Sequence, residues 1–335
     1  IRDRDKKQTG IVLGIILIVV LLFWKPFAEK CQEVGKQTKS STDTTKVMIK
    51  KNKTKEMDLK KNQKKTLKVY EDDKLVENKN VIWESEDSSV ASIDETGTIT
   101  ANKAGKCVIS CHSKGQEESG DSITVVVLPE EANIYKMGFY MQPIPPAIKK
   151  RMDGKSYKKN EDISYSDLRY LSLKHYGFDG KIKSGEMVVH KDIAQDVVEI
   201  FYKLYKRNYP IEKMKLIDEY GADDTASMED NNTSCFNYRL VAGSTHLSKH
   251  SYGCAIDINP QINPYIDSSG TISPKNGAVY ADRDSSKCDG KYKNYMIQRN
   301  DEVYKLFESY GFTWGGDWKT VKDYQHFQKV ANVEK

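Results

Sequence analysis

The sequence is poor in cysteine, and its six cysteines form no C-x-x-C pair. They are too few and too scattered for a disulfide scaffold, and they do not fix the redox compartment. Cys107 and Cys111 lie four residues apart in a predicted strand, which separates them by about 13 Å and is too far for a disulfide between them. The fold must therefore rest on buried apolar side chains, and a hydrophobic content of 38% can supply them.

The chain also lacks a basic folded body. Its net charge is +5, but residues 30–68 alone carry +9 and residues 1–29 carry +2, so the remainder stands at −6. A protein that binds nucleic acid needs a basic face on its folded domain to neutralise phosphates. We therefore predict no nucleic-acid partner and assign the basic stretch to a stalk.

One long uncharged run is present, Gly10–Trp24, bounded by Lys7 and Lys25. As a helix it would rise about 22 Å, short of the roughly 30 Å hydrocarbon core. Extended to residue 28, with Lys25 reaching the interface, it spans roughly 28 Å. We predict an uncleaved transmembrane helix, the membrane anchor, over residues 10–28. The alternative is the apolar part of a cleaved signal peptide, although no small residues at A-x-A spacing follow it.

The length of 335 residues suggests two folded domains plus connecting pieces. We predict a cytoplasmic N-terminus over residues 1–9 and a basic linker over residues 29–46. Residues 129–150 are predicted as a linker or entry arm, because Pro143, Pro145 and Pro146 cannot continue a helix or a strand ladder. The second folded domain then covers residues 151–335.

Residues 47–128 consist of short β runs separated by turn residues, and seven runs in about 80 residues predict an all-β sandwich. The runs are 47–49, 66–70, 81–83, 90–93, 98–101, 107–111 and 122–128. The stretch W-E-S-E-D-S-S-V-A-S-I-D-E-T-G-T-I-T-A from Trp83 resembles the group 2 bacterial immunoglobulin-like domains of surface proteins. That resemblance implies an extracytoplasmic spacer or adhesive role.

The second domain mixes helical and strand patterns. Residues 167–176, 191–207 and 301–310 are predicted as helices, and residues 255–259 alternate like a strand. The apolar stripe of the second helix is interpreted as core and consists of Ile193, Val197, Ile200, Phe201 and Leu204. The order of these elements predicts an α+β domain with long loops.

The most informative segment is S-K-H-S-Y-G-C-A-I-D-I-N, residues 248–259. On its strand Ile256 and Ile258 share the core face, so Asp257 points to the other side. The preceding loop is long enough for His250 to fold back towards Asp257. Imidazole nitrogen and carboxylate oxygen are both zinc donors.

A second segment, G-F-T-W-G-G-D-W from residue 311, is followed by D-Y-Q-H-F from residue 323. Asp323 and His326 lie on one face of a helical turn or close together in a tight loop. A catalytic zinc site needs three protein ligands, an open position for water and a base for the proton of that water. His250, Asp257 and His326 can supply the ligands. Asp323 can supply the base.

Together the motifs S-x-H-x-x-G-x-A-x-D, W-G-G-D-W and D-x-x-H-F resemble the VanY-type D-alanyl-D-alanine carboxypeptidases and the related L-alanyl-D-glutamate endopeptidases of phage lysins. The resemblance extends over residues 137–330. It includes the segments 209–211, 231–234, 236–239 and 259–260. It implies a small α+β zinc peptidase fold, shared with the hedgehog signalling domain, that cuts the stem peptide of peptidoglycan.

The resemblance also implies roles for single residues. His250, Asp257 and His326 match the Zn²⁺ ligands, and Asp323 matches the general base. Arg239 matches a family arginine that meets the substrate carboxylate or the developing oxyanion, for which a permanent planar fork of donors is suited.

Other residues near the motifs are assigned by their chemistry. Ser248 is expected to bind substrate, and Trp314 and Trp318 are expected to shape the substrate groove, with a place in the core as their alternative. Asp317 could orient a ligand imidazole. His246 is interpreted as a bystander because no glutamate follows it, unlike in H-E-x-x-H.

The resemblance implies a zinc-dependent peptidase acting on peptidoglycan stem peptides, and we favour a D-alanyl-D-alanine carboxypeptidase. An L-alanyl-D-glutamate type endopeptidase is one alternative. A non-catalytic zinc-containing surface protein is another, but it would not need Asp323. Wall peptide as substrate implies a single-pass protein of the cell membrane with its catalytic domain outside. The basic stalk would then lie near anionic lipid headgroups or wall polymers.

Overall fold

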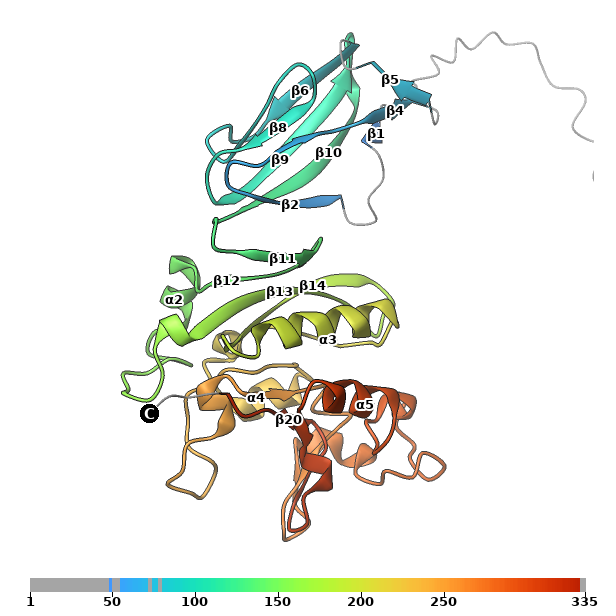
Figure 1. The fold of residues 1–335 in the computed structure, drawn as a ribbon. Coiled ribbons are helices and arrows are strands. Elements are labelled where there is room, and N and C mark those ends of the chain that lie inside the picture. Colours follow the sequence, from blue (N-terminus) through green and yellow to red (C-terminus); the bar gives the residue numbers. More distant parts are fainter. Residues whose placement is uncertain (1–47, 50–54, 72–73, 78–79, 332–335) are drawn as a thin grey trace, which may run out of the picture. The chain divides into compact units, whose positions relative to one another are not determined.

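The computed structural model describes residues 48–49, 55–71, 74–77 and 80–331 (Figure 1). The predicted membrane anchor, residues 10–28, and the basic linker, residues 29–46, lie outside these ranges. Within the described ranges, no helix combines the length and the apolar character that crossing a bilayer requires. The membrane anchor therefore stays a prediction.

The first folded part is an all-β sandwich, as the sequence predicts. Its strands are β1 (Met48–Ile49), β2 (Glu56–Lys60), β3 (Lys64–Thr66), β4 (Val69–Glu71), β5 (Lys74–Val76), β6 (Val81–Ser85), β7 (Ala91–Ile93), β8 (Thr98–Ala101), β9 (Gly105–Ser113) and β10 (Gln116–Leu128). They form sheets in the orders β2-β10-β9-β6, β3-β8-β7 and β1-β4-β5. Ile99, Ile109 and Val125 are fully buried between the strands.

Strands β2 and β5 of the sandwich have no predicted counterpart, and β3 shares only Thr66 with the predicted run 66–70. Strand β2 has only two apolar side chains, Met57 and Leu59, in a lysine-rich segment, but both are buried in the core. The alternation of these two side chains with polar residues is the pattern of a half-buried strand. The polar residues between and around them made the segment look like part of the lysine-rich stretch. Strand β5 is mostly exposed and carries no clear period.

The second folded part begins with an antiparallel sheet in the order β11-β12-β13-β14. Its strands are β11 (Asn133–Lys136), β12 (Phe139–Pro143), β13 (Leu168–Tyr176) and β14 (Ile182–His190). Helix α3 (Ala194–Lys206) packs across β12 and β13 (Figure 1). All five residues of the predicted apolar stripe on this helix are buried, which confirms their interpretation as core.

Two expectations for this sheet differ from the structure. Residues 129–150 are not only a linker, since they supply β11, β12 and helix α2 (Pro146–Met152). Pro143 ends β12 and Pro146 begins α2, positions at which proline needs no backbone donor. The prediction of a helix over residues 167–176 is wrong, because this segment is the inner strand β13, with buried side chains on both faces.

The rest of the domain consists of short elements joined by long loops. They are η2 (Tyr165–Asp167), η3 (Ile217–Tyr220), α4 (Asp224–Glu229), η4 (Lys249–Tyr252), β15 (Ala255–Asp257), β16 (Tyr265–Ile266), β17 (Ile272–Ser273), η5 (Lys275–Tyr280), η6 (Lys293–Tyr295), α5 (Glu302–Ser309), β18 (Thr313–Trp314), η7 (Gly315–Asp317), β19 (Lys322–Asp323) and β20 (His326–Gln328). The short strands form two small sheets, β15-β20-β18 and β17-β16-β19. The predicted strand at 255–259 and helix at 301–310 are both present, slightly shortened.

A stacked aromatic pair connects helix α5 to the small sheet β15-β20-β18. Phe307 is fully buried and stacks on Phe327, with ring centroids 4.2 Å apart. Phe327 directly follows His326 in β20. The core therefore fixes the strand that carries this histidine.

We predict that Phe307→Ala lowers the free energy of unfolding by about 3–5 kcal/mol, because it removes a fully buried ring and leaves a cavity behind β20. Urea denaturation measures the loss. Val279→Ala, at a side chain that is 46% exposed, is the control and should change stability by less than about 0.5 kcal/mol. Equal stability of the two variants would contradict this role for Phe307.

Candidate functional site

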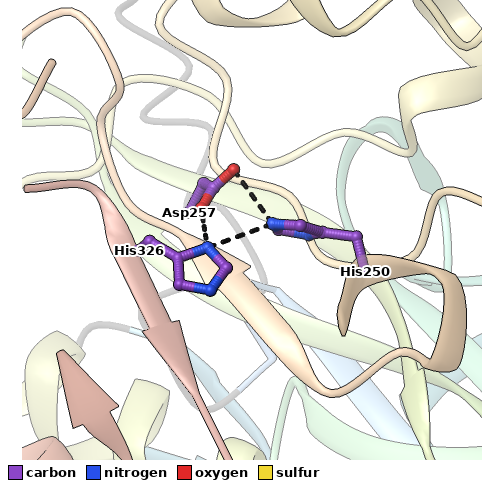
Figure 2. Close-up of side chains that lie close together, drawn as sticks. All are labelled: His250, Asp257 and His326. Atoms are coloured by element: carbon purple, nitrogen blue, oxygen red, sulfur yellow. Dashed lines mark hydrogen bonds and ion pairs between the residues drawn. The ribbon is translucent and has the colours of Figure 1, made fainter. Parts of the chain in front are cut away.

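Three predicted ligands converge in the second domain. Figure 2 shows His250, Asp257 and His326 pointing at one another from three separate segments. His250 Nε2 lies 3.3 Å from Asp257 Oδ2, and His326 Nδ1 lies 3.1 Å from Asp257 Oδ1. The two imidazole nitrogens are 3.3 Å apart. These residues are the group of possible metal ligands found among the described residues, with donor atoms within 4.8 Å of one another.

Strand pairing places two of the three residues. Asp257 ends β15 and His326 begins β20, and the antiparallel register puts them directly opposite each other. Directly opposed residues of an antiparallel pair have Cβ atoms about 4.5–5.5 Å apart, so both side chains reach one point. On either side of Asp257, Ile256 and Ile258 are fully buried in the core. The alternation predicted from the sequence is confirmed.

A short 3-10 turn supplies the third residue. His250 lies in η4, and the Ser248 side chain at the N-cap accepts a hydrogen bond from the His250 backbone N–H. Gly253 ends the turn with φ +65°, and a Cβ at this position would lie 2.7 Å from the backbone nitrogen of His190. Only glycine meets both demands. The glycine of S-x-H-x-x-G thus lets the chain reverse between His250 and Asp257.

In each imidazole, the outer nitrogen, which is the one that faces away from Asp257, lies next to a hydrogen-bond acceptor. His250 Nδ1 is 2.6 Å from the Cys235 carbonyl oxygen, and His326 Nε2 is 3.1 Å from Gln328 Oε1. Because these oxygens can only accept, each outer nitrogen carries the proton. His250 Nε2 and His326 Nδ1 are therefore the nitrogens that face Asp257 and could bind a metal ion. Gln328 was not singled out from the sequence, where its position two residues after His326 was the available signal.

The three residues fit a zinc ion. Two nitrogens and one carboxylate are a donor set of catalytic zinc sites, which keep a fourth position open. Two ligands of a tetrahedral zinc ion, each about 2.0–2.1 Å from the metal, lie roughly 3.3 Å apart. The two imidazole nitrogens are separated by 3.3 Å, which agrees with that value, and each of them lies 3.1 or 3.3 Å from a different carboxylate oxygen of Asp257.

Burial makes the electrostatics of this group strong. Burial alone would raise the pKa of Asp257, but His250 and His326 outweigh it and hold that pKa well below its usual range. Burial alone would lower the pKa of His326, but the hydrogen bond to Asp257 and the charge of Asp323 raise it to about 9. Without metal, the group thus keeps a proton on His326. A metal ion would displace this proton, so its affinity should fall in acid.

Asp323, the predicted base, lies beside the three ligands but is not one of them. Its Oδ2 is 3.9 Å from His326 Nδ1, and its Oδ1 is buried without a hydrogen-bond partner. Burial raises the pKa of Asp323 to about 6, although His326 opposes the shift. A buried carboxylate with a raised pKa and an unpaired oxygen is suited to accept a proton.

Residues of the W-G-G-D-W motif pack against the backbone of Asp323 and Tyr324. A Cβ at Gly315 would lie 2.6 Å from the Asp323 backbone oxygen and 2.8 Å from its Cβ. The indole N–H of Trp314 donates to the Tyr324 carbonyl oxygen at 2.9 Å. The motif thus forms a close backbone contact with the turn between Asp323 and His326, which is a tight loop between β19 and β20.

The structure gives the other predicted site residues different surroundings. Trp314 is buried and packs in the core, the alternative given for it, and it also lines an open pocket together with Trp318. Trp318 is half-buried with its ring centroid 5.2 Å from that of His326. Ser248 is buried and caps the turn of His250. His246 is exposed, outside the group of ligands.

Two charged residues are held by ion pairs. The Arg239 guanidinium pairs with Asp224, which also accepts a hydrogen bond from Asn237 at 2.7 Å. Asp317 pairs with Arg299 at 3.5 Å. The expectation that Asp317 orients a ligand imidazole is not supported, because Gln328 fills that place on His326.

Comparisons with known proteins support both resemblances. Residues 242–329 match the family model described as D-alanyl-D-alanine carboxypeptidase, and residues 43–125 match the bacterial Ig-like domain, group 2. The chain is also 31% identical over 87 residues to peptidoglycan L-alanyl-D-glutamate endopeptidase CwlK of Bacillus subtilis (strain 168). This match covers 25% of the chain and 41% of that relative, so less than half of the relative is spanned. The two resemblances inferred from the sequence are confirmed.

Solved structures give weaker matches. Domains 4 and 5 of the S-layer protein SbsC are 20% identical with a TM-score of 0.20, covering 24% of this chain and 44% of that one. An intimin mutant of EHEC O157:H7 is 22% identical with a TM-score of 0.18, covering 39% and 74%. Such low scores carry no argument about fold or function.

We predict that Gln328→Ala weakens zinc binding about 10–100-fold, because His326 loses the acceptor that fixes its tautomer. Gln328→Glu keeps an acceptor oxygen at this position and should bind zinc more tightly than Gln328→Ala. Competition with a chelating dye measures the affinities. Unchanged affinity in a folded Gln328→Ala protein would contradict the assigned role.

Proposed function

We propose that this protein is a zinc-dependent peptidase that hydrolyses peptidoglycan stem peptides. The observation that carries the proposal is the buried group of His250, Asp257 and His326 with the Asp323 carboxylate beside it, whose Oδ1 has no hydrogen-bond partner. A purely structural metal site would not need this fourth residue. The family model and the endopeptidase relative support the same substrate class.

The positions of these side chains indicate which role each of them has in hydrolysis. A zinc ion held by His250, Asp257 and His326 would supply Lewis-acid chemistry by acidifying water and polarising the scissile carbonyl. Asp323 accepts the proton of the attacking water. The same carboxyl group then donates this proton to the leaving amine, so that Asp323 serves as base and then as acid.

We further propose that the enzyme is a D-alanyl-D-alanine carboxypeptidase. Arg239 would meet the terminal carboxylate of the substrate, and its ion pair with Asp224 would hold the guanidinium in place. Trp318 would form one wall near His326. The alternative is cleavage between L-alanine and D-glutamate, the bond named for the matched relative.

Wall peptide as substrate requires that the catalytic domain lie outside the membrane. We propose a single-pass protein of the cell membrane, anchored through residues 10–28 with residues 1–9 inside. The basic stalk, net charge +9 over residues 30–68, would then face anionic lipid headgroups or wall polymers.

The full chain should cleave purified stem peptides, and Asp323→Ala should lower kcat by about 10²–10⁴-fold while zinc stays bound. Mass spectrometry identifies the cut. Loss of a terminal D-alanine establishes a carboxypeptidase, and an internal cut establishes an endopeptidase. Asp179→Ala, at an exposed carboxylate, is the matched control and should cleave like the wild type. Absence of cleavage by the zinc-loaded wild type would overturn the proposal.

Activity should be lost in acid. Asp323 acts as a base only when ionised, and its pKa is raised to about 6 by burial. A bound dication lowers this pKa, so kcat/KM should rise with pH through a midpoint at or below about 6. Initial rates at saturating zinc measure the profile. A rate that stays flat between roughly pH 4 and 8 would contradict Asp323 as the base.

A further inference from the structure

Arg283, which lies outside the motifs, contacts residues next to both the metal-ligand strand β15 and the Asp323 turn. Arg283 follows η5, in the long segment between β17 and α5. Its Nη1 donates to the carbonyl oxygens of Ile262 and Tyr280 at 2.8 and 3.1 Å. Its Nη2 donates to Asn263 Oδ1 at 2.9 Å and to the Ile297 carbonyl oxygen at 2.8 Å. The guanidinium thus holds four acceptors that are all uncharged.

The first connection leads to the metal-ligand strand. Asn263 is fully buried, and its Nδ2 donates to the Ile258 carbonyl oxygen at 3.0 Å. Ile258 directly follows Asp257. Because the Asn263 side chain binds Arg283 with its oxygen and Ile258 with its nitrogen, it fixes the guanidinium relative to the end of β15.

The second connection leads to the base. The guanidinium carbon of Arg283 lies 4.4 Å from the ring centroid of Tyr324, a cation–π contact. Tyr324 directly follows Asp323. Its carbonyl oxygen is bound by Trp314, so both its ring and its backbone are held. Movement of this ring would carry the Asp323 turn with it.

We propose that Arg283 is a positioning residue that sets the distance between Asp323 and the ligand group by bracing Tyr324 against the end of β15. The planar fork is essential, because the ammonium group of a lysine has only three donors and could not hold four acceptors. Arg283 itself does not touch the reacting atoms. The inference rests on the proposed peptidase function for its kinetic test, but the geometry can be tested without activity.

The kinetic test uses Arg283→Lys, Tyr324→Leu and their combination in the full zinc-loaded chain. Each single variant should lower kcat about 10–100-fold, with KM and zinc affinity within about threefold of wild type. The double variant should lose no more kcat than the more impaired single variant, because both changes break the contact between Arg283 and Tyr324. Tyr324→Phe keeps the aromatic ring, so its kcat should be higher than that of Tyr324→Leu. Arg207→Lys, at an exposed arginine, is the matched control.

The second readout is amide hydrogen exchange in the metal-free protein. Both single variants should exchange at least about threefold faster over residues 322–328, while residues 194–206 of α3 stay protected. The exchange measurement does not depend on peptidase activity. A wild type that cleaves no stem peptide would therefore overturn the proposed function but not the bracing role. If Arg283→Lys does not fold, Tyr324→Leu decides alone. Unchanged kcat and exchange, additive losses, or a matching loss of zinc affinity would each overturn the bracing role.

Discussion

The site depends on one backbone pairing, the antiparallel register that sets Asp257 of β15 opposite His326 of β20. Residues 69 positions apart in the chain thereby become cross-strand neighbours. A slip of β15 by one residue would turn the Asp257 side chain to the core and bring Ile256 or Ile258 to the site. The fully buried isoleucines and the stacked rings of Phe307 and Phe327 prevent that slip, so core packing and metal-ligand geometry are the same constraint.

Around this pairing, hydrogen bonds fix what strand geometry leaves free. The Cys235 carbonyl and Gln328 select the imidazole nitrogens that face Asp257, and Gly315 allows the Asp323 turn to approach closely. The resulting cluster holds two histidines and two carboxylates with little solvent. Each carboxylate has a different environment, because Asp257 is paired with both imidazoles and Asp323 keeps an oxygen unpaired. This asymmetry separates a ligand from a base.

The sequence predicted the ligand group because its motifs fix local geometry. The alternation around Asp257 and the glycine after His250 are short-range signals. The same reasoning failed for β13, because a strand buried on both faces has no period of two that separates it from a helix. It also missed Gln328 and Arg283, whose roles depend on which segments the fold brings together. For Trp314 the sequence left a groove and the core open, and an indole whose N–H finds a backbone acceptor can lie in the core.

The most direct test of the account is a zinc-edge anomalous diffraction experiment on crystals of the zinc-loaded protein. The account predicts one strong anomalous peak, at a zinc ion that is bound by His250 Nε2, an Asp257 carboxylate oxygen and His326 Nδ1 at about 2.0–2.1 Å. Asp323 should lie beside the open position of this ion. Coordination through His326 Nε2, Asp323 as a direct ligand, or no peak at this group would contradict it.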